Sequence, residues 1–219
     1  MTGYLTQILA GAWLTLTLAL CALSLGLALG LLAALAESRS WPLARYLATG
    51  LITLIRGLPE LLVIFIIYFG GTLVLSKLLG HYVNVSAFIA GTVALALLFA
   101  AYASQVFRGA LGAIPHTQIE SAQALGLTAA QVFRRIVLPQ AWRHALPGLG
   151  NLWLVLLKDT ALISLIGLPD LMGKAQVAAS ATHQPFVYYL LAALLYLMMT
   201  GLSQRVVFNL SYKANRHLL

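Results

Sequence analysis

The chain has 219 residues, of which 61% are hydrophobic and only 8% are charged, and its formal net charge is +8. This balance leaves too little polar surface to cover a soluble globule, so it excludes a soluble domain and indicates an integral membrane protein. A helix needs about 20 apolar residues to cross the hydrocarbon core, and five such runs fit within the chain. We therefore predict one all-α transmembrane domain over residues 1–219 with five spans.

The five apolar runs follow one another along the chain. The first, Ala12 to Ala36, contains no charged residue. Residues 1–11 contain no Lys or Arg, and the run is longer than the apolar core of a secretory signal, so we expect a retained span. The other runs are Tyr46 to Leu75, Ala87 to Phe107, Ala145 to Leu168 and Phe186 to Val207. The second and fourth contain ionisable residues, so they are not expected to face lipid alone.

Basic residues are distributed unevenly between the two sides of this topology. If the N-terminus is outside, the outer loops contain Lys77 and Lys174, and the other Lys and Arg residues of the loops are inside. The inner set is Arg39, Arg45, Arg108, Arg134, Arg135, Arg143, Arg205, Lys213 and Arg216. The positive-inside rule then places the C-terminus in the cytoplasm. Topology and contacts with anionic lipid headgroups explain the net charge, so no nucleic-acid partner is predicted.

Residues 108–143 form the one sizeable loop, and their local signals predict two short helices that meet at a turn. The spacings of two capping boxes are present in Thr117 with Glu120 and in Thr128 with Gln131. Gly126 stands where a left-handed residue ends the first helix, and Pro139 is expected to stop the second.

These signals alone allow two interpretations of the insert. It could be a well-capped connector on the membrane surface, with Glu120 used in closing its own helix start. Alternatively, the narrow apolar edge formed by Ile119, Ala122 and Leu125 could dock into a groove on a soluble partner.

The spacing of the insert favours the second interpretation. The pattern is Glu-x-Ala, a glycine six residues after the glutamate, nine further residues and Ile-x-Leu-Pro. The residues that match it are Glu120, Ala122, Gly126, Ile136, Leu138 and Pro139. This pattern resembles the signature loop of the membrane subunits of ATP-binding-cassette importers, with Ser121 in place of the usual first alanine.

Further blocks resemble the polar amino acid uptake subfamily, particularly its histidine and arginine permeases. They are Arg56-Gly57-Leu58-Pro59-Glu60, Ala100-Ala101-Tyr102, Phe107-Arg108-Gly109, Ala145-Leu146-Pro147-Gly148-Leu149-Gly150-Asn151 and Leu157-Lys158-Asp159-Thr160-Ala161-Leu162. Together with the signature loop, these blocks extend over nearly the whole chain.

This resemblance implies a five-helix subunit with the type I importer fold in the bacterial inner membrane. It implies that residues 120–139 contact a cytoplasmic ATPase dimer through a coupling helix, with Glu120, Ser121, Ala122, Gly126, Ile136, Leu138 and Pro139 as the contact set. It further implies a second permease, identical or paralogous, and a substrate-binding protein on the outer side. The chain is not expected to be an enzyme or to bind a cofactor, because Gly173-Lys174 lacks the remainder of a Walker A sequence.

Ionisable groups at bilayer depth each need a partner or a water-filled cavity. In the second run, Thr53, Arg56 and Glu60 are spaced to share one helical stripe; in the fourth, Asp159, Thr160 and Ser164 are the polar candidates. We predict that these residues bind substrate. The alternative is structural: Arg56 and Glu60 could neutralise each other as an i,i+4 pair, and Lys158 could bind a carboxylate of another helix.

Carboxylates in a cavity would favour a cationic side chain, so the prediction is import of a basic L-amino acid by alternating access. One rival is a self-sufficient proton-coupled transporter or exporter, in which Glu60 or Asp159 carries the proton. Another is a membrane scaffold that recruits a soluble enzyme. The histidines have no metal-ligand spacing on a helix, so no metal site is predicted.

Overall fold

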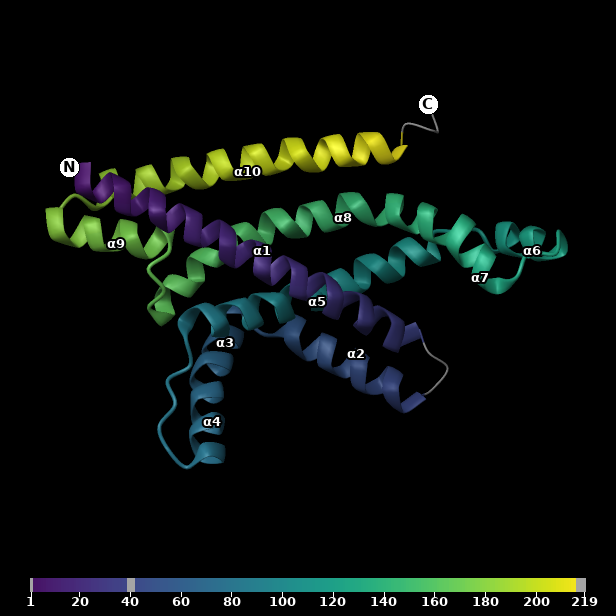
Figure 1. The fold of residues 1–219 in the computed structure, drawn as a ribbon, viewed down its shortest axis with the longest axis horizontal. Coiled ribbons are helices and arrows are strands. Elements are labelled where there is room, and N and C mark those ends of the chain that lie inside the picture. The colour runs from purple at the N-terminus through teal and green to yellow at the C-terminus, as the bar shows by residue number, and fades with distance from the viewer. Residues whose placement is uncertain (1, 39–41, 216–219) are drawn as a thin grey trace.

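The structure, a computed structural model, describes residues 2–38 and 42–215, which fold almost entirely into helices. Four long helices extend along the long axis of the molecule (Figure 1): α1 (Thr2–Ser38), α5 (Ala87–Gly112), α8 (Leu138–Asp159) and α10 (Pro185–Asn215). They pack in the order α1, α5, α8 and α10. Helix α2 (Pro42–Gly57) packs on α1 and α5, and α9 (Leu171–Thr182) packs on α1 and α10.

The prediction of five spans is confirmed for the described residues. Five helical segments are long and apolar enough to cross a membrane: Gly3–Glu37, Glu60–Leu79, Ala87–Gly112, Ala129–Ile166 and Pro185–Ala214. Each predicted run overlaps one of them. Arg39 and Arg216, which contribute to the predicted charge asymmetry, lie outside the described residues.

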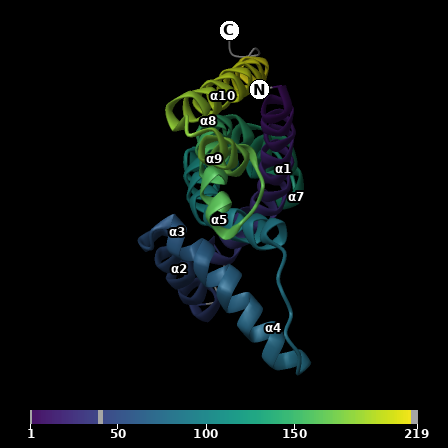
Figure 2. The ribbon, with the colours of Figure 1, turned by 90° about the vertical axis from the view of Figure 1, so that its left-hand side faces the viewer.

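The second predicted run, Tyr46 to Leu75, is wrong as a single helix. Helix α2 ends at Gly57, and a new helical segment begins at Glu60, made of α3 (Glu60–Phe65), the π-helical turn η1 (Ile66–Gly70) and α4 (Gly71–Leu79). Pro59 has extended backbone angles, φ −57° and ψ 136°, and its carbonyl accepts the amide of Leu62 at 3.0 Å. Because a proline disfavours helix in the residue before it, the chain turns here, and α4 projects away from the bundle (Figure 2).

The centre of the fold is α5, against which α1 packs unusually closely. A side chain at Gly26 would meet Phe99 Cδ1 at 2.8 Å and the Ala96 carbonyl oxygen at 3.0 Å. One turn on, a side chain at Gly30 would meet Ala103 Cβ at 3.0 Å and the Ala100 carbonyl oxygen at 3.1 Å. Small residues four apart allow two helix backbones to approach in a membrane, where burial of apolar surface drives association only weakly.

After α8 the chain continues as the 3₁₀ helix η3 (Thr160–Ile166), and Asp170 then caps the start of α9. Asp170 is fully buried, and its Oδ1 accepts the amide of Gly173 at 2.9 Å. Its Oδ2 has no hydrogen-bond partner among the described residues. Burial raises the pKa of Asp170 to about 6, although the amide hydrogen bonds at the helix start oppose the shift.

The substitution Asp170→Asn is therefore expected to stabilise the protein above about pH 6. A carboxyl group whose pKa is higher in the folded state loses stability as the pH rises from its unfolded pKa to its folded one, and the loss persists above that. An asparagine oxygen still accepts the Gly173 amide, but it carries no charge to bury. The gain is up to about 3 kcal/mol by the conversion of pKa shifts. Thermal unfolding in detergent at about pH 4.5 and about pH 8 measures it. The same melting temperature for both proteins at the higher pH would contradict the assignment.

Candidate functional site

The predicted insert is a compact pair of short helices at one end of the bundle (Figure 1). Helix α6 (His116–Ala124) and helix α7 (Ala129–Val132) are joined by a turn in which Gly126 has φ +82°. This left-handed conformation confirms the role predicted for Gly126 at the end of the first helix. The insert is tied back to the bundle where Gln140 Nε2 donates to Gln118 Oε1 at 2.7 Å.

One of the two predicted capping boxes is present. The Thr128 hydroxyl accepts the amide of Gln131, and the Gln131 side chain accepts the amide of Thr128 at 2.9 Å. The box predicted for Thr117 and Glu120 is wrong, because α6 begins at His116, before Thr117. Pro115 takes the capping position instead, and its carbonyl accepts the amide of Gln118 at 3.1 Å.

The prediction that Pro139 stops the second helix is also wrong. Helix α7 continues through the π-helical turn η2 (Phe133–Val137) directly into α8, which holds Pro139 within its first turn. A proline removes one backbone donor and crowds the preceding turn, and a π-helical turn is a recognised way to absorb such a local mismatch. The helical path from Ala129 to Asp159 is therefore unbroken and is about 45 Å long at about 1.5 Å per residue.

The signature residues are divided between the surface and the interior of the insert. Glu120, Ser121 and Gly126 are exposed, whereas Ala122 is buried. Ile136 is half-buried, and Leu138 and Pro139 are exposed. A shallow hollow of about 400 Å³ opens between α6 and η2, and its lining includes Ser121, Leu125 and Ile136. Leu125 is 83% exposed at its edge, which leaves an apolar side chain in solvent.

A second concave site lies between α3, α5 and α8. Glu60 at the start of α3 and Asp159 at the end of α8 line one cavity of about 170 Å³. Its remaining walls are apolar or aromatic and come from α5 and α8: Leu95, Leu98, Phe99, Tyr102, Leu152, Val155 and Leu156. The fold thus brings together two carboxyl groups that are 99 positions apart in the sequence.

Arg56 lies next to this cavity, and its guanidinium carbon is 5.3 Å from the centroid of the Tyr102 ring, which also forms part of the wall. Such a position is favourable for a cation over an aromatic face.

The predicted helical stripe of Thr53, Arg56 and Glu60 is wrong, because the helix ends at Gly57, after Thr53 and Arg56 and before Glu60. The i,i+4 geometry for an Arg56–Glu60 pair is lost for the same reason.

The three hydroxyl residues predicted for the site are not among those that line the cavity. Thr53 is exposed on α2. Thr160 is buried, and its hydroxyl donates to the Leu157 carbonyl at 2.7 Å and lies 3.3 Å from the Tyr196 hydroxyl. The Ser164 hydroxyl donates to the Ala161 carbonyl at 2.7 Å. The hydroxyls of Thr160 and Ser164 are thus satisfied by backbone carbonyls of their own helical segment.

Comparison with known proteins assigns the chain to a family. Residues 26–213 match the family model described as "Binding-protein-dependent transport system inner membrane component". The chain belongs to this family. It is thus the membrane component of an ATP-driven transport system and not its ATPase, and the self-sufficient proton-coupled transporter is disfavoured.

Individual relatives agree with the family model. The permease is 47% identical to the arginine ABC transporter permease protein ArtQ of Escherichia coli K12, with 94% of each chain covered. It is 38% identical to the histidine/lysine/arginine/ornithine transport system permease protein HisQ of the same organism, over 94% of this chain and 92% of that one. The crystal structure of an amino acid ABC transporter with histidines matches with a TM-score of 0.86 and 33% identity, over 97% of this chain and 96% of that one.

One charged cluster of the permease was missed by the sequence analysis. Glu37 is only 3% exposed, at the end of α1, and its carboxylate accepts from residues of two other helices. Arg108 Nη1 donates to it at 2.9 Å, Gln105 Nε2 at 3.3 Å and the Thr49 hydroxyl at 3.2 Å. The sequence contains a signal for this cluster, because Glu37 is one of only five acidic residues and directly follows an apolar run. A carboxylate in that position is costly to bury unless it is paired. Tyr102 was likewise quoted in a family block but not proposed for the site.

The two ends of the Glu37–Arg108 ion pair are expected to respond unequally to substitution. The Arg108 side chain is 38% exposed and that of Glu37 is 1% exposed. Arg108→Gln leaves an unpaired carboxylate inside the protein and is expected to cost about 3 kcal/mol, whereas Glu37→Gln leaves a cation that can reach water and costs about 1 kcal/mol.

Melting temperatures of the two single variants and the double variant in detergent test this asymmetry. The double variant is expected to be more stable than Arg108→Gln alone, because it no longer buries a charge. Equal and additive losses would show that the pair is not coupled in the way described.

Proposed function

We propose that this permease imports basic L-amino acids by alternating access, with the cavity of Glu60 and Asp159 as its substrate site. The observation that carries the proposal is the position of these two carboxyl groups in one cavity at the far end of the helix that begins in the insert. A movement of the insert would then reach the substrate site through a continuous helical path rather than through a flexible loop.

The chemistry of the cavity supports a cationic substrate. Among the described residues, neither Glu60 nor Asp159 forms an ion pair within 4 Å, so a bound ammonium or guanidinium group would supply the opposite charge. The aromatic ring of Tyr102 offers a second surface for such a group, and the Arg56 guanidinium already lies beside that ring. Arginine, histidine and lysine are named for the relatives, and they fit this arrangement.

The insert is proposed to be the coupling element to a cytoplasmic ATPase dimer. Glu120 and Ser121 are exposed on α6, and Leu125 projects from its end into solvent, so a polar and an apolar contact are both available to a partner. Ala122 is buried within the insert and Gly126 shapes its turn, so these two would hold the contact surface in place. Ile136, Leu138 and Pro139 join that surface to α8.

A second permease subunit and an external binding protein complete the proposed assembly. Helix α4 leaves the bundle and exposes apolar side chains, with Leu73, Val74 and Leu78 each more than half exposed, which fits a partner helix in the membrane. The proposed orientation puts the N-terminus outside and the insert in the cytoplasm. It follows from the basic residues Arg108, Arg134 and Arg135 around the insert.

The proposed substrate site predicts that Glu60→Gln and Asp159→Asn each weaken arginine uptake. The loss of one counter-charge is expected to raise the concentration for half-maximal uptake by about tenfold or more, since a charged hydrogen bond contributes about 1.5–3 kcal/mol. Proteoliposomes containing the whole transporter and its binding protein measure both uptake and ATP hydrolysis. Asp170→Asn, which changes a buried carboxyl outside the cavity, is the matched control. Unchanged arginine selectivity in the Glu60→Gln/Asp159→Asn double variant would refute recognition by carboxylates.

The proposed coupling role predicts that Gly126→Asp abolishes uptake and loosens the ATPase, while membrane insertion stays normal. Gly80→Asp is the matched control, because Gly80 also has a positive φ, at +71°, and open space around it, but it ends α4. Co-purification of the ATPase and uptake of labelled arginine are the two measurements. Glu120→Arg tests the exposed charge separately. Normal uptake with both Gly126→Asp and Glu120→Arg would rule out the insert as the coupling element.

A further inference from the structure

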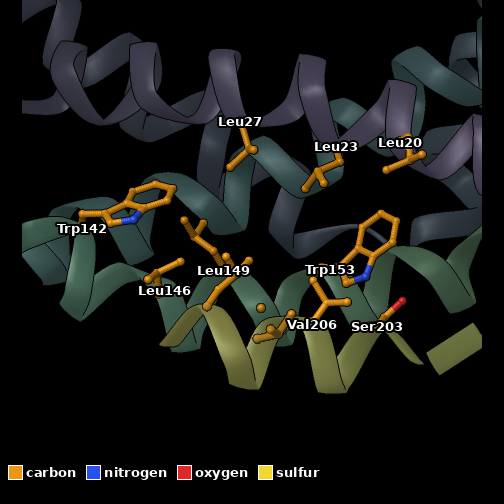
Figure 3. A pocket seen from close by; sticks show the side chains of 12 residues that line it. Leu20, Leu23, Leu27, Trp142, Leu146, Leu149, Trp153, Ser203 and Val206 are labelled. Atoms are coloured by element: carbon orange, nitrogen blue, oxygen red, sulfur yellow. The ribbon is translucent and has the colours of Figure 1, made fainter. Parts of the chain in front are cut away.

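A further hollow of the permease lies against a neighbouring face of α8 from the one that lines the carboxylate cavity. It has a volume of about 360 Å³ and is lined by α1, α8 and α10 (Figure 3). Leu23 and Leu27 come from α1, Leu146 and Leu149 from α8, and Val206 from α10. Trp142 stands at one end, and Trp153 lies towards the other end, next to Leu20 and Ser203 (Figure 3). Apart from Trp142 at the start of α8, its lining residues lie outside the predicted loop 108–143, and none of them lines the proposed substrate site.

The lining of this groove rules out water as a good occupant. Apart from the Ser203 hydroxyl and the two indole groups, the side chains that line it are aliphatic. A water molecule needs two to four polar partners, and this surface does not offer them along most of its length. All three helices belong to segments that are long and apolar enough to cross a membrane, so the groove is accessible to lipid hydrocarbon.

The groove is elongated rather than round. Trp142 and Trp153 are eleven positions apart on α8, a distance of about 16 Å along the helix at about 1.5 Å per residue. The floor is held by close contact of α8 with α10, because a side chain at Gly150 would collide with Val207. An apolar trough of this length, parallel to the membrane-spanning helices, has the shape of an extended acyl chain.

Two basic residues, Lys213 of α10 and Arg143 of α8, lie at the level of one end of the groove along their helices. On α10 the lining residues Ser203, Val206 and Leu210 recur every three or four positions, and Lys213 continues the same stripe. Helices α8 and α10 run in opposite directions, and Gly150 meets Val207. At about 1.5 Å per residue, Lys213 is about 9 Å from this contact along α10, and Trp142 is about 12 Å from it along α8. Because the helices are antiparallel, both residues lie towards the same end of the groove. Arg143 follows Trp142 directly.

We infer that this groove binds one acyl chain of an anionic phospholipid, whose headgroup lies at Lys213 and Arg143. The aliphatic lining and the length of the groove select the chain, and the two cations select the charge of the headgroup. Trp142 at the same end suits the boundary between hydrocarbon and headgroups, where an indole ring has one apolar and one polar part. The inference does not depend on the proposed amino acid substrate.

Fluorescence quenching by brominated lipids tests this inference with the tryptophans that the groove already contains. In the full-length chain with Trp13→Phe and Trp41→Phe, the emission comes from Trp142 and Trp153. Phosphatidylglycerol with brominated acyl chains is titrated into the detergent-solubilised protein, with phosphatidylcholine of the same chains as the reference. Saturable quenching is expected, at a lipid concentration about thirtyfold lower for phosphatidylglycerol, because two basic residues at an anionic headgroup each provide a preference of about fivefold.

Two substitutions separate the headgroup from the chain. Lys213→Gln is expected to reduce the preference for phosphatidylglycerol by about fivefold and leave the phosphatidylcholine curve unchanged. Val206→Phe fills the groove and is expected to weaken saturable quenching by both lipids. Leu197→Phe is its control, because Leu197 is also exposed on α10 but nine positions earlier, on the opposite face.

Two results would overturn the inference. Quenching that rises without saturation and is the same for both lipids would mean unspecific contact with the detergent and lipid phase. Quenching that is lost as the protein dimerises, with the dimer measured by light scattering, would mean that a second copy of the chain fills the groove instead. Saturable quenching with the expected responses of Lys213→Gln and Val206→Phe supports the lipid.

Discussion

Close approach of α1 and α5 is the constraint on which the rest of this structure depends. In lipid, two helices gain little from burying apolar side chains, so they associate where their backbones can come near enough for extensive contact. Gly26 and Gly30 provide that surface on α1, and Ala96, Ala100 and Ala103 provide it on α5. With α1 held against one side of α5, the other sides remain for α8, α2 and α3. Helices α3 and α8 build the carboxylate cavity together with α5.

The buried and cavity-lining carboxyl groups of the permease lie in three different kinds of surroundings. Glu37 is surrounded by donors from α2 and α5 and helps to join the ends of three helices. Asp170 caps α9 from a fully buried position at the cost of a raised pKa. Glu60 and Asp159 instead face a cavity, without an ion-pair partner among the described residues. The fold pairs the Glu37 carboxylate with three donors, whereas one oxygen of Asp170 has no hydrogen-bond partner among the described residues. Glu60 and Asp159 together form the negative site that the proposed cationic substrate would complete.

The helix from the insert through α8 connects the two regions proposed to be functional. One of its ends carries the surface of the insert, and the other ends at Asp159 in the cavity wall. A π-helical turn in front of Pro139 keeps this path helical where a proline would otherwise interrupt it. The same helix forms one wall of the apolar groove, so a bound acyl chain would lie against the element that the proposed mechanism moves.

The sequence by itself determined the membrane class, the number of spans, the position of the insert and the left-handed turn at Gly126, because composition, hydrophobic length and glycine conformation are local properties. The signature spacing also pointed to the correct family before any fold was known. Local signals gave wrong predictions at three places where neighbouring elements compete. Pro115, and not Thr117, occupies the capping position of α6, and the helix continues past Pro139 through a π-helical turn. Pro59 divides an apolar run that hydropathy alone treats as one continuous span. Only the tertiary structure decided that Glu60 shares a cavity with Asp159, that Thr160 and Ser164 bond to their own helix, and that Glu37 meets Arg108. Such pairings depend on how distant helices pack, and no spacing within one helix specifies which residue of another helix will face it.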